Sequence, residues 1–187
     1  MSADLGWTGR LLVATPALAH ETFHRTVVLL LQHAPEDGAL GVVLNRPSGT
    51  PVEEVLPGWG ALAGEPPLVF EGGPVSPTTA ICVARTRAVD SALAPVSGAP
   101  LLATVDLDAP VGRVAAAVSG LRVFAGYAGW SPGQLEAERD EGSWWLLDAL
   151  PGDPLAGAPE LLWQHVLRRQ GPPLAFAASY PADPGLN

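Results

Sequence analysis

The sequence predicts a single domain of the α+β class. Of its 187 residues, 48% are hydrophobic and 16% are charged, a globular balance with enough apolar side chains for one sizeable core. Helical and strand-like segments mix without the regular βαβ order of a parallel, doubly wound sheet, so an irregular α/β fold is the nearest alternative. The chain has no internal repeat and no long polar linker. We therefore expect one compact domain.

The first part of the chain is dominated by strand patterns. Residues 10–14 form an apolar segment that a proline soon follows, which predicts a first strand. Residues 25–33 are an almost continuous β-branched and apolar run, which is typical of a strand covered on both faces. An Asp-Gly turn comes next, and residues 40–47 return as the partner strand. These two strands are the clearest hairpin that the sequence predicts.

A short helix and three strands are predicted for the middle of the chain. Thr50 stands at an N-cap position, with a proline directly after it and Glu53 in the first turn, so residues 50–57 are expected to form a capped helix. A Gly-Gly-Pro turn separates two apolar segments, and a loop rich in Ala, Pro and Ser at residues 86–100 precedes a third. The predicted strands are residues 67–76, 78–85 and 100–108.

The last part of the chain alternates helices and strands. Asp108 is placed to cap an Ala-rich helix at residues 109–120, and Gly120 to end it. Ser131 and Gln134 stand in a capping-box arrangement, which predicts the start of a further helix. The other elements expected here are a strand at 121–130, the helix at 131–142, a strand at 143–150, a helix at 158–171 and a final strand at 173–180.

Composition disfavours several classes of partner. The chain has ten basic residues, all arginines, against 19 acidic ones, which gives a net charge of −9. The clustered cations that bind a phosphate backbone are therefore scarce. No apolar run approaches the ~18 residues of a membrane span, and the N-terminal apolar segment lacks the basic start of a signal peptide. The single cysteine, Cys82, excludes an intrachain disulfide and is expected to be a buried small hydrophobe. We expect a cytoplasmic protein with neither a nucleic acid nor a membrane as its partner.

Residues 20–24, His-Glu-Thr-Phe-His, match the H-E-x-x-H pattern of zinc hydrolases. Such a site needs both histidines one turn apart on a stable helix, together with a third ligand. Here Pro16 precedes the motif and β-branched residues follow it, which leaves room for a turn or two. His33 and His165 are the remaining candidates for a third ligand. We interpret the motif as a coincidence on a loop or single turn, and we predict no metal and no cofactor.

Polar residues and glycines mark a candidate binding cleft. Asn45 and Arg46 end a buried strand, where polar side chains often line a crevice. Gly72 and Gly73 precede a proline, which indicates a turn with unusual dihedral angles or room for another group. Glu71, directly before them, is the best placed ionisable group. Arg46 is expected either to pair with Glu71 or to bind an anion, and a purely structural ion pair is the alternative.

The stretch Gly-Tyr-Ala-Gly-Trp at residues 126–130 supplies the rest of the candidate cleft. Tyr127 and Trp130 would form an aromatic wall of the cleft. Gly129, which lies between them in the chain, and Gln134, on the following helix, are its other members. The small residues of this stretch equally suit tight packing of the strand, which is the alternative interpretation. The acidic residues of the following helix are expected to form a solvated face.

Five stretches occur in order along the chain: GRLLVATPAL, RTVVLL, GALGVVLNRP, VFEGGPVS and RVFAGYAGWSPGQLEAE, with DPGLN at the end. Together they resemble the YqgE/AlgH family, also called UPF0301 or DUF179, from about Gly9 to Asn187. The resemblance implies a bifurcated mixed β-sheet that forms a pseudo-barrel with flanking helices. The positions of His20 and Glu21 usually hold Asp and Pro in this family, which supports the interpretation of the histidine motif as a coincidence.

The sequence favours a non-enzymatic, ligand- or protein-binding regulatory domain. It contains no G-x-S-x-G, P-loop, G-x-G-x-x-G or C-x-x-C pattern, and a chain without lysine forms no Schiff base. We therefore name no catalytic residue. The alternatives are a metal-assisted hydrolase and a transcriptional regulator, a label that the family carries, acting on DNA directly or through a partner. The expected partner is a small molecule or another protein.

Overall fold

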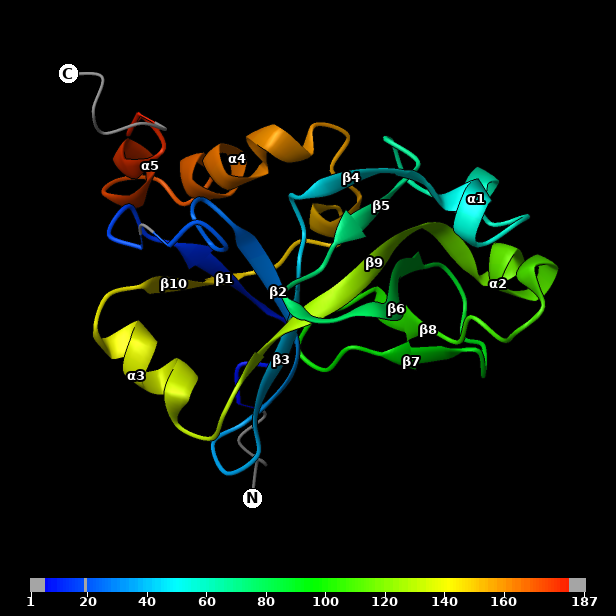
Figure 1. The fold of residues 1–187 in the computed structure, drawn as a ribbon, viewed down its shortest axis with the longest axis horizontal. Helices are drawn as coiled ribbons and strands as arrows, with labels where there is room; N and C mark the ends of the chain where they lie inside the picture. The colour runs from blue at the N-terminus through cyan, green and yellow to red at the C-terminus, as the bar shows by residue number, and fades with distance from the viewer. Residues whose placement is uncertain (1–5, 19, 182–187) are drawn as a thin grey trace.

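The structure is a computed structural model that describes residues 6–18 and 20–181. In this part of the chain ten strands form a curled, mostly antiparallel half-barrel sheet, which confirms the α+β class (Figure 1). The order along its main path is β10-β1-β2-β3-β9-β6-β8-β7, with β4 and β5 beside it. The strands are β1 (Arg10–Ala14), β2 (Val27–Ala34), β3 (Gly38–Val43), β4 (Pro47–Pro51), β5 (Leu68–Glu71), β6 (Val75–Thr86), β7 (Leu93–Pro95), β8 (Leu102–Val105), β9 (Val118–Trp130) and β10 (Trp144–Asp148).

Short helices flank the sheet. Helices α4 and α5 lie beside one another along one border of the molecule, α1 and α2 lie near one end of β9, and α3 lies near its other end (Figure 1). None of the described helices is long and apolar enough to cross a membrane. The helices are α1 (Val52–Val55), α2 (Val111–Ala117), α3 (Gln134–Asp140), α4 (Leu162–Arg168) and α5 (Leu174–Ala177), with 3-10 turns at Gly60–Leu62, Asp153–Leu155 and Pro159–Leu161.

Strand β2 is buried on both faces, as its apolar run predicts. Val27 and Leu29 lie in a core that side chains of α4 complete, whereas Val28 and Leu30 lie in a second core that includes Leu135 of α3. Successive strand residues point to opposite faces, so both cores draw on the same strand. The predicted hairpin with β3 is confirmed, since the two strands pair in antiparallel fashion.

A further core lies between β6, β8 and β9 on one side and α1 and α2 on the other. Val52 of α1 and Val114 of α2 have no exposed surface there. Cys82 of β6 belongs to this core and is 2% exposed, and burial raises the pKa of its thiol to about 12. The predicted burial of this cysteine is confirmed. The raised pKa keeps the thiol protonated at neutral pH.

The sheet forks at Gly72, directly after β5. Strands β3 and β9 pair through Gly41 and Ala128, among others, and then diverge. In the gap the Gly72 amide donates to the Ala125 carbonyl of β9, and the Gly72 carbonyl accepts from the Val43 amide of β3, each over 2.9 Å. Strand β5 runs parallel to β9 and is thus inserted between β3 and β9. The bifurcated mixed sheet that the resemblance implies is confirmed.

Arg122 of β9 is a charged side chain with no exposed surface. Burial lowers its pKa to about 10, which still leaves the guanidinium charged at neutral pH. Its donors tie the loop before β5 and the turn after β10 to the sheet, so Arg122 organises backbone that has no strand partner. The acceptors are the carbonyls of Gly64, Glu65, Pro66, Pro154 and Ala156, at 2.6 to 3.3 Å.

The predicted final strand at residues 173–180 is wrong, because this segment contains α5. The Ala175 amide donates to the Gly171 carbonyl over 2.9 Å, and the Tyr180 amide donates to the Ala177 carbonyl over 3.1 Å. Alanine has the highest helix propensity, and these local bonds satisfy the backbone without a neighbouring strand.

Several predicted helix boundaries are also wrong, because strand pairing competes with helical turns. Helix α1 begins after Pro51, and the expected cap Thr50 belongs to β4. Helix α2 has Pro110 at its N-cap rather than Asp108, and it ends before Val118. Gly120 lies in β9, paired with β6, so the backbone there finds its partners in the sheet.

The C-terminal helices start later than predicted. Helix α3 begins after Gly133, and the capping box forms in half: the Ser131 amide donates to Oε1 of Gln134 over 3.0 Å, while no cap comes from the serine hydroxyl. Helix α4 begins at Leu162, after a 3-10 turn. Strands β4 and β7 were not predicted because they contain prolines, which lack the amide donor and occur at sheet edges.

Candidate functional site

A cavity lies beside the fork of the sheet. It has a volume of about 330 Å³, and Arg46, Glu71 and Gly73 line it. Arg46 follows β3 and Glu71 ends β5, and the Glu71 amide donates to the Arg46 carbonyl over 2.8 Å. The structure thus brings three residues of the predicted cleft to one place. The other lining residues are Glu21, Thr22, Val43 and Pro74.

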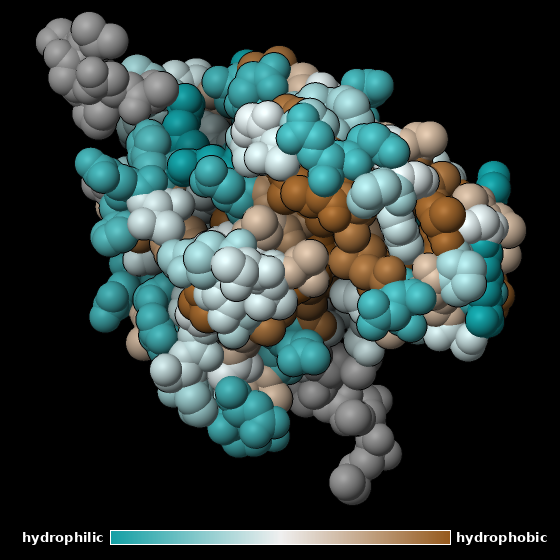
Figure 2. Space-filling model, turned by 45° about the vertical axis from the view of Figure 1, so that its right-hand side comes forward, coloured by the Kyte–Doolittle hydropathy of each residue, from teal (hydrophilic) through white to brown (hydrophobic). Residues whose placement is uncertain are grey.

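A larger groove adjoins this cavity and shares Glu71 and Gly73 with it. Its volume is about 640 Å³, and it is lined by apolar residues of β5 and β9, among them Val69, Val123 and Ala125. Figure 2 shows apolar side chains gathered in a hollow on one face of the molecule, with polar residues around it. The remaining lining residues are Ser48, Thr50, Val55, Leu56, Pro77, Thr78, Thr79, Ala80 and Phe124.

The polar side chains near the cavity differ in how far they are engaged. The Asn45 carboxamide accepts from the Val27 amide and donates to a carbonyl of the preceding turn, each over 2.9 Å, so it serves the fold. Nη2 of Arg46 donates to the His24 carbonyl over 2.9 Å. The Glu71 carboxylate is exposed and bonds to no residue that the structure describes. The ion pair considered for Arg46 and Glu71 is therefore not formed in the described chain, and Glu71 offers a free negative charge.

Gly72, Gly73 and Gly126 let the backbones at the fork touch. Gly126 has a φ of 71°, and a Cβ atom there would lie 2.7 Å from the Gly73 carbonyl oxygen. A Cβ atom on Gly72 would lie 2.3 Å from the Gly126 carbonyl oxygen, and one on Gly73 would lie 2.2 Å from the Tyr127 carbonyl carbon. No side chain fits at such distances, so these glycines serve close packing of backbone.

The aromatic half of the predicted site does not line the cavity at Glu71. Tyr127 packs against the core that α4 completes, and Gly129 pairs with β3. Trp130 is 7% exposed, and its indole nitrogen donates to Oε2 of Glu138 over 2.9 Å. Gln134 donates to the other oxygen of Glu138, also over 2.9 Å. The aromatic wall expected beside Glu71 is replaced by a network around Glu138 of α3.

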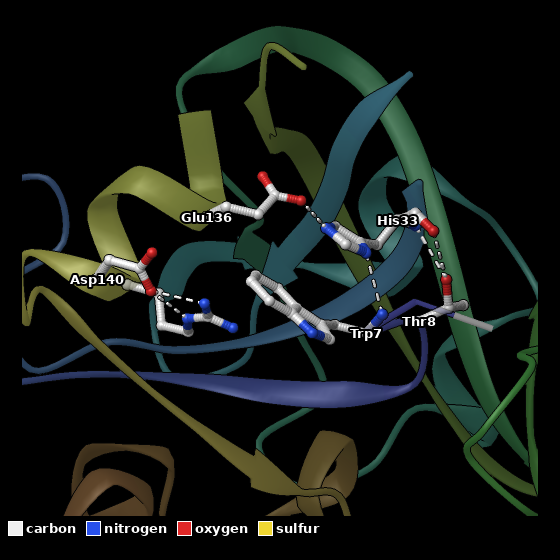
Figure 3. A network of polar contacts seen from close by, with 6 residues as sticks. Trp7, Thr8, His33, Glu136 and Asp140 are labelled. Atoms are coloured by element: carbon white, nitrogen blue, oxygen red, sulfur yellow. Dashed lines mark hydrogen bonds and ion pairs between the residues drawn. The ribbon is translucent and has the colours of Figure 1, made fainter. Parts of the chain in front are cut away.

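A second polar network, which the sequence did not predict, joins the N-terminal segment to α3 (Figure 3). Nδ1 of His33 accepts from the Trp7 amide over 3.0 Å, so the ring proton sits on Nε2, which lies 2.8 Å from Oε1 of Glu136. The Trp7 ring stacks on the imidazole with centroids 4.5 Å apart, and the Arg139 guanidinium lies 4.5 Å from a Trp7 ring centroid. His33 and Glu136 are 103 residues apart, so no local pattern reveals their contact.

The H-E-x-x-H motif lies in turns between β1 and β2. The His24 amide donates to the His20 carbonyl over 2.9 Å, which is a single helical turn as predicted. The ring of His33, one of the candidate third ligands, is engaged by Glu136. Within the described residues, no three His, Cys, Asp or Glu side chains are placed to hold a metal ion.

Comparison with known sequences shows the family of this chain. A family model described as AlgH-like matches residues 11–175. The chain belongs to the AlgH-like family. A UPF0301 protein of Streptomyces avermitilis is 54% identical to it over 188 residues, which cover 96% of this chain and 95% of that one. A UPF0301 protein of Thermobifida fusca is 46% identical over 194 residues, which cover 98% and 96% of the two chains.

Solved structures share the AlgH-like fold. The crystal structure of a Corynebacterium diphtheriae protein superimposes with a TM-score of 0.88 at 34% identity, covering 96% of this chain and 95% of that one. The solution structure of the AlgH protein from Pseudomonas aeruginosa gives a TM-score of 0.69 at 28% identity and covers 97% of both chains. The overall fold of this chain is therefore shared with proteins of two other bacteria.

Proposed function

We propose that this AlgH-like protein is a non-enzymatic, ligand- or protein-binding regulatory domain. Its binding surface is the cavity at Arg46 and Glu71 together with the adjoining groove. The observation that carries the proposal is the carboxylate of Glu71, which lies where these two hollows join and has no partner in the described part of the chain. An apolar hollow with a few converging polar groups is the usual form of a binding site, and a carboxylate with no partner among the described residues can meet a ligand without first breaking an internal bond.

The charge of this surface argues for binding of something other than DNA. The cavity carries the carboxylates of Glu21 and Glu71 against the single guanidinium of Arg46. The whole chain has a net charge of −9, and phosphate backbones are bound by clustered cations. A regulatory effect on transcription would therefore act through a ligand or a partner protein.

Thermal denaturation against a panel of amino acids, nucleotides, sugar phosphates and divalent metal ions tests the proposal. A ligand at 100 times its Kd stabilises the native state by ~2.7 kcal/mol, which raises the Tm of a domain of this size by roughly 5–10 °C. We expect Glu71→Gln to lose the shift while its own Tm stays near that of the parent protein, because the carboxylate has no partner among the described residues.

Two variants complete the test. Glu160→Gln changes another exposed glutamate, on the Pro159–Leu161 turn, and should keep the shift. Ala80→Phe fills the groove from an exposed position on β6 and should reduce binding of any ligand that occupies it. If a ligand shifts the parent, Glu71→Gln and Ala80→Phe equally, the binding surface lies elsewhere and the proposal is wrong.

A further inference from the structure

The groove runs along β5 and also across its neighbours, since Thr50 of β4, Ala125 of β9 and Ala80 of β6 line it too. Near the start of this strand, Leu68 pairs with Pro51, where α1 begins, and α1 contributes Val55 to the lining. At the other end of β5, Glu71 lines both the groove and the neighbouring cavity. Strands rise ~3.3 Å per residue, so β5 alone gives the groove a length of roughly 10 Å before the cavity extends it. Together with the adjoining cavity, this length is enough for a few residues of an extended chain along β5.

Unpaired backbone lies along one wall of the groove. In β6, Val75 pairs with Tyr127 and Ala80 pairs with Ala125, so residues 76–79 stand opposite the single residue between them in β9. The pairing of β6 with β8 covers only Val83 to Arg85. The described chain thus provides no strand partner for residues 76–79, and all four are exposed. Ser76 has a left-handed φ of 46° and Pro77 has no amide, so Thr78 and Thr79 are the residues whose backbone can exchange hydrogen bonds with another chain.

The charge at the far end of the groove selects for a cation. The carboxylate of Glu71 has no partner within residues 6–18 and 20–181, and Glu21 adds a second carboxylate to the same cavity. Arg46 balances only one of these two carboxylates, so the lining of the cavity carries a net charge of −1. An incoming ammonium or guanidinium would therefore meet one excess negative charge.

From these features we infer that the groove binds an extended peptide segment of a partner protein. Its apolar side chains, at alternate positions, contact Val69, Val123 and Ala125, and a Lys or Arg reaches Glu71. Alternate side chains of an extended chain point the same way, and its main chain can bond to the backbone of Thr78 and Thr79. The inference rests on the proposed function and specifies the class of partner.

The experiment is a selection from a displayed library of random 12-residue peptides on the full-length protein, with counter-selection on Ala80→Phe. We expect enriched peptides to carry apolar residues at alternate positions and a Lys or Arg near one end. Glu71→Lys should weaken such a peptide by roughly fivefold or more, because it replaces an attraction by a repulsion. A second selection on Glu71→Lys should return Asp or Glu at the position of the basic residue.

Two control variants test whether the loss of peptide binding is specific to the groove or follows from any added charge or ring. Glu160→Lys makes the same charge change at an exposed site away from the groove, and Ala137→Phe adds the same ring on the exposed side of α3. Both should bind the enriched peptides like the parent protein. In amide NMR spectra, the peptide should shift the signals of Thr78 and Thr79 and leave that of Ala137 unchanged.

The outcomes distinguish the peptide from other ligands. Enrichment of peptides without the alternation, equal binding to Ala80→Phe, or no enrichment at all would overturn the inference. If a small molecule gives a thermal shift that Glu71→Gln loses while the library gives no peptide, the proposed function stands and the peptide is the wrong ligand class. If neither a small molecule nor a peptide depends on Glu71 or Ala80, both proposals fail.

Discussion

The guanidinium carbon of Arg122 lies 4.1 Å from the centroid of the Phe70 ring. Phe70 belongs to β5 and Arg122 to the neighbouring strand β9, so the contact links the two strands beside the fork. The Phe70 ring also meets Phe124 edge-on, with centroids 6.2 Å apart. Because Glu71 directly follows Phe70, the buried cation fixes the strand whose end carries the free carboxylate of the proposed binding surface.

Replacing Arg122 should destabilise the protein strongly. In Arg122→Met the carbonyls that the guanidinium now satisfies would stay buried without a donor, and each such group costs roughly 1–3 kcal/mol. We expect the free energy of unfolding in urea to fall by at least about 3 kcal/mol. Arg85→Met, at an exposed position of β6, should change it by less than about 0.5 kcal/mol. Equal midpoints for the two variants would show that the buried network contributes little.

Gly73→Ala should disrupt the fork. Its φ is 154°, and an added Cβ atom would lie 2.2 Å from the Tyr127 carbonyl carbon, so the backbone of β9 would have to move. We expect a loss of stability of at least about 2 kcal/mol, measured by thermal and urea denaturation. Gly112→Ala is the control, because nothing lies within 4 Å of its added Cβ atom and it stands in α2, where alanine is the better helix former. A Tm that falls equally for both variants would contradict the steric argument.

Glu138 should be required for the aromatic cluster under α3. Its Oε2 accepts from the indole nitrogens of Trp130 and Trp144, each over 2.9 Å, and the two rings are 7% and 3% exposed. Glu138→Ala would leave two indole donors unpaired, which should cost about 2–4 kcal/mol in urea unfolding and change the tryptophan emission. Glu138→Gln keeps an acceptor oxygen and should lose less. Glu141→Ala, at an exposed position beyond α3, should leave both readouts unchanged.

Glu53 should make the turn after α1 sensitive to acid. Its carboxylate accepts from the Gly58 amide over 2.9 Å and from the Gly60 amide over 3.0 Å, and these bonds lower the pKa of Glu53 below its ordinary value of 4.5. A lowered pKa means that the folded state favours the ionised form, so the stabilisation is complete above pH 4.5 and is lost as pH falls through the folded pKa.

The pH dependence of the Tm measures this effect. Glu53→Gln should melt below the parent protein at pH 7, and the difference should shrink as the pH falls below 4.5 and through the lowered pKa of the folded state, where the parent carboxylate also becomes protonated. Glu54→Gln, at the exposed neighbouring position, should show no such convergence. A difference between Glu53→Gln and the parent that stays constant down to pH 3 would mean that the ionised carboxylate is not what stabilises the turn.

Local patterns predicted most of the strands and much of the site's framework. The apolar run at residues 25–33 predicts a strand that is buried on both faces, because its alternate side chains pack into two different cores. The polar ends of β3 and β5 placed Arg46 and Glu71 at one cavity, since neighbouring strands bring their ends together. The predictions failed where a strand far away in the sequence competes with a local helical turn for the same backbone. Gly120 was expected to end a helix, but it pairs with β6.

The sequence by itself determined the class of the fold, the hairpin of β2 and β3, the burial of Cys82 and the acidic character of the surface, because these depend on composition and on neighbours along the chain. Only the tertiary structure decided which ionisable groups are engaged. Arg46 donates to the carbonyl of His24, Glu136 contacts His33, and Glu71 has no partner among the residues that the structure describes. The physical reason is that a hydrogen bond forms between groups that are close in space. Which groups are close depends on how strands from remote parts of the chain pack together.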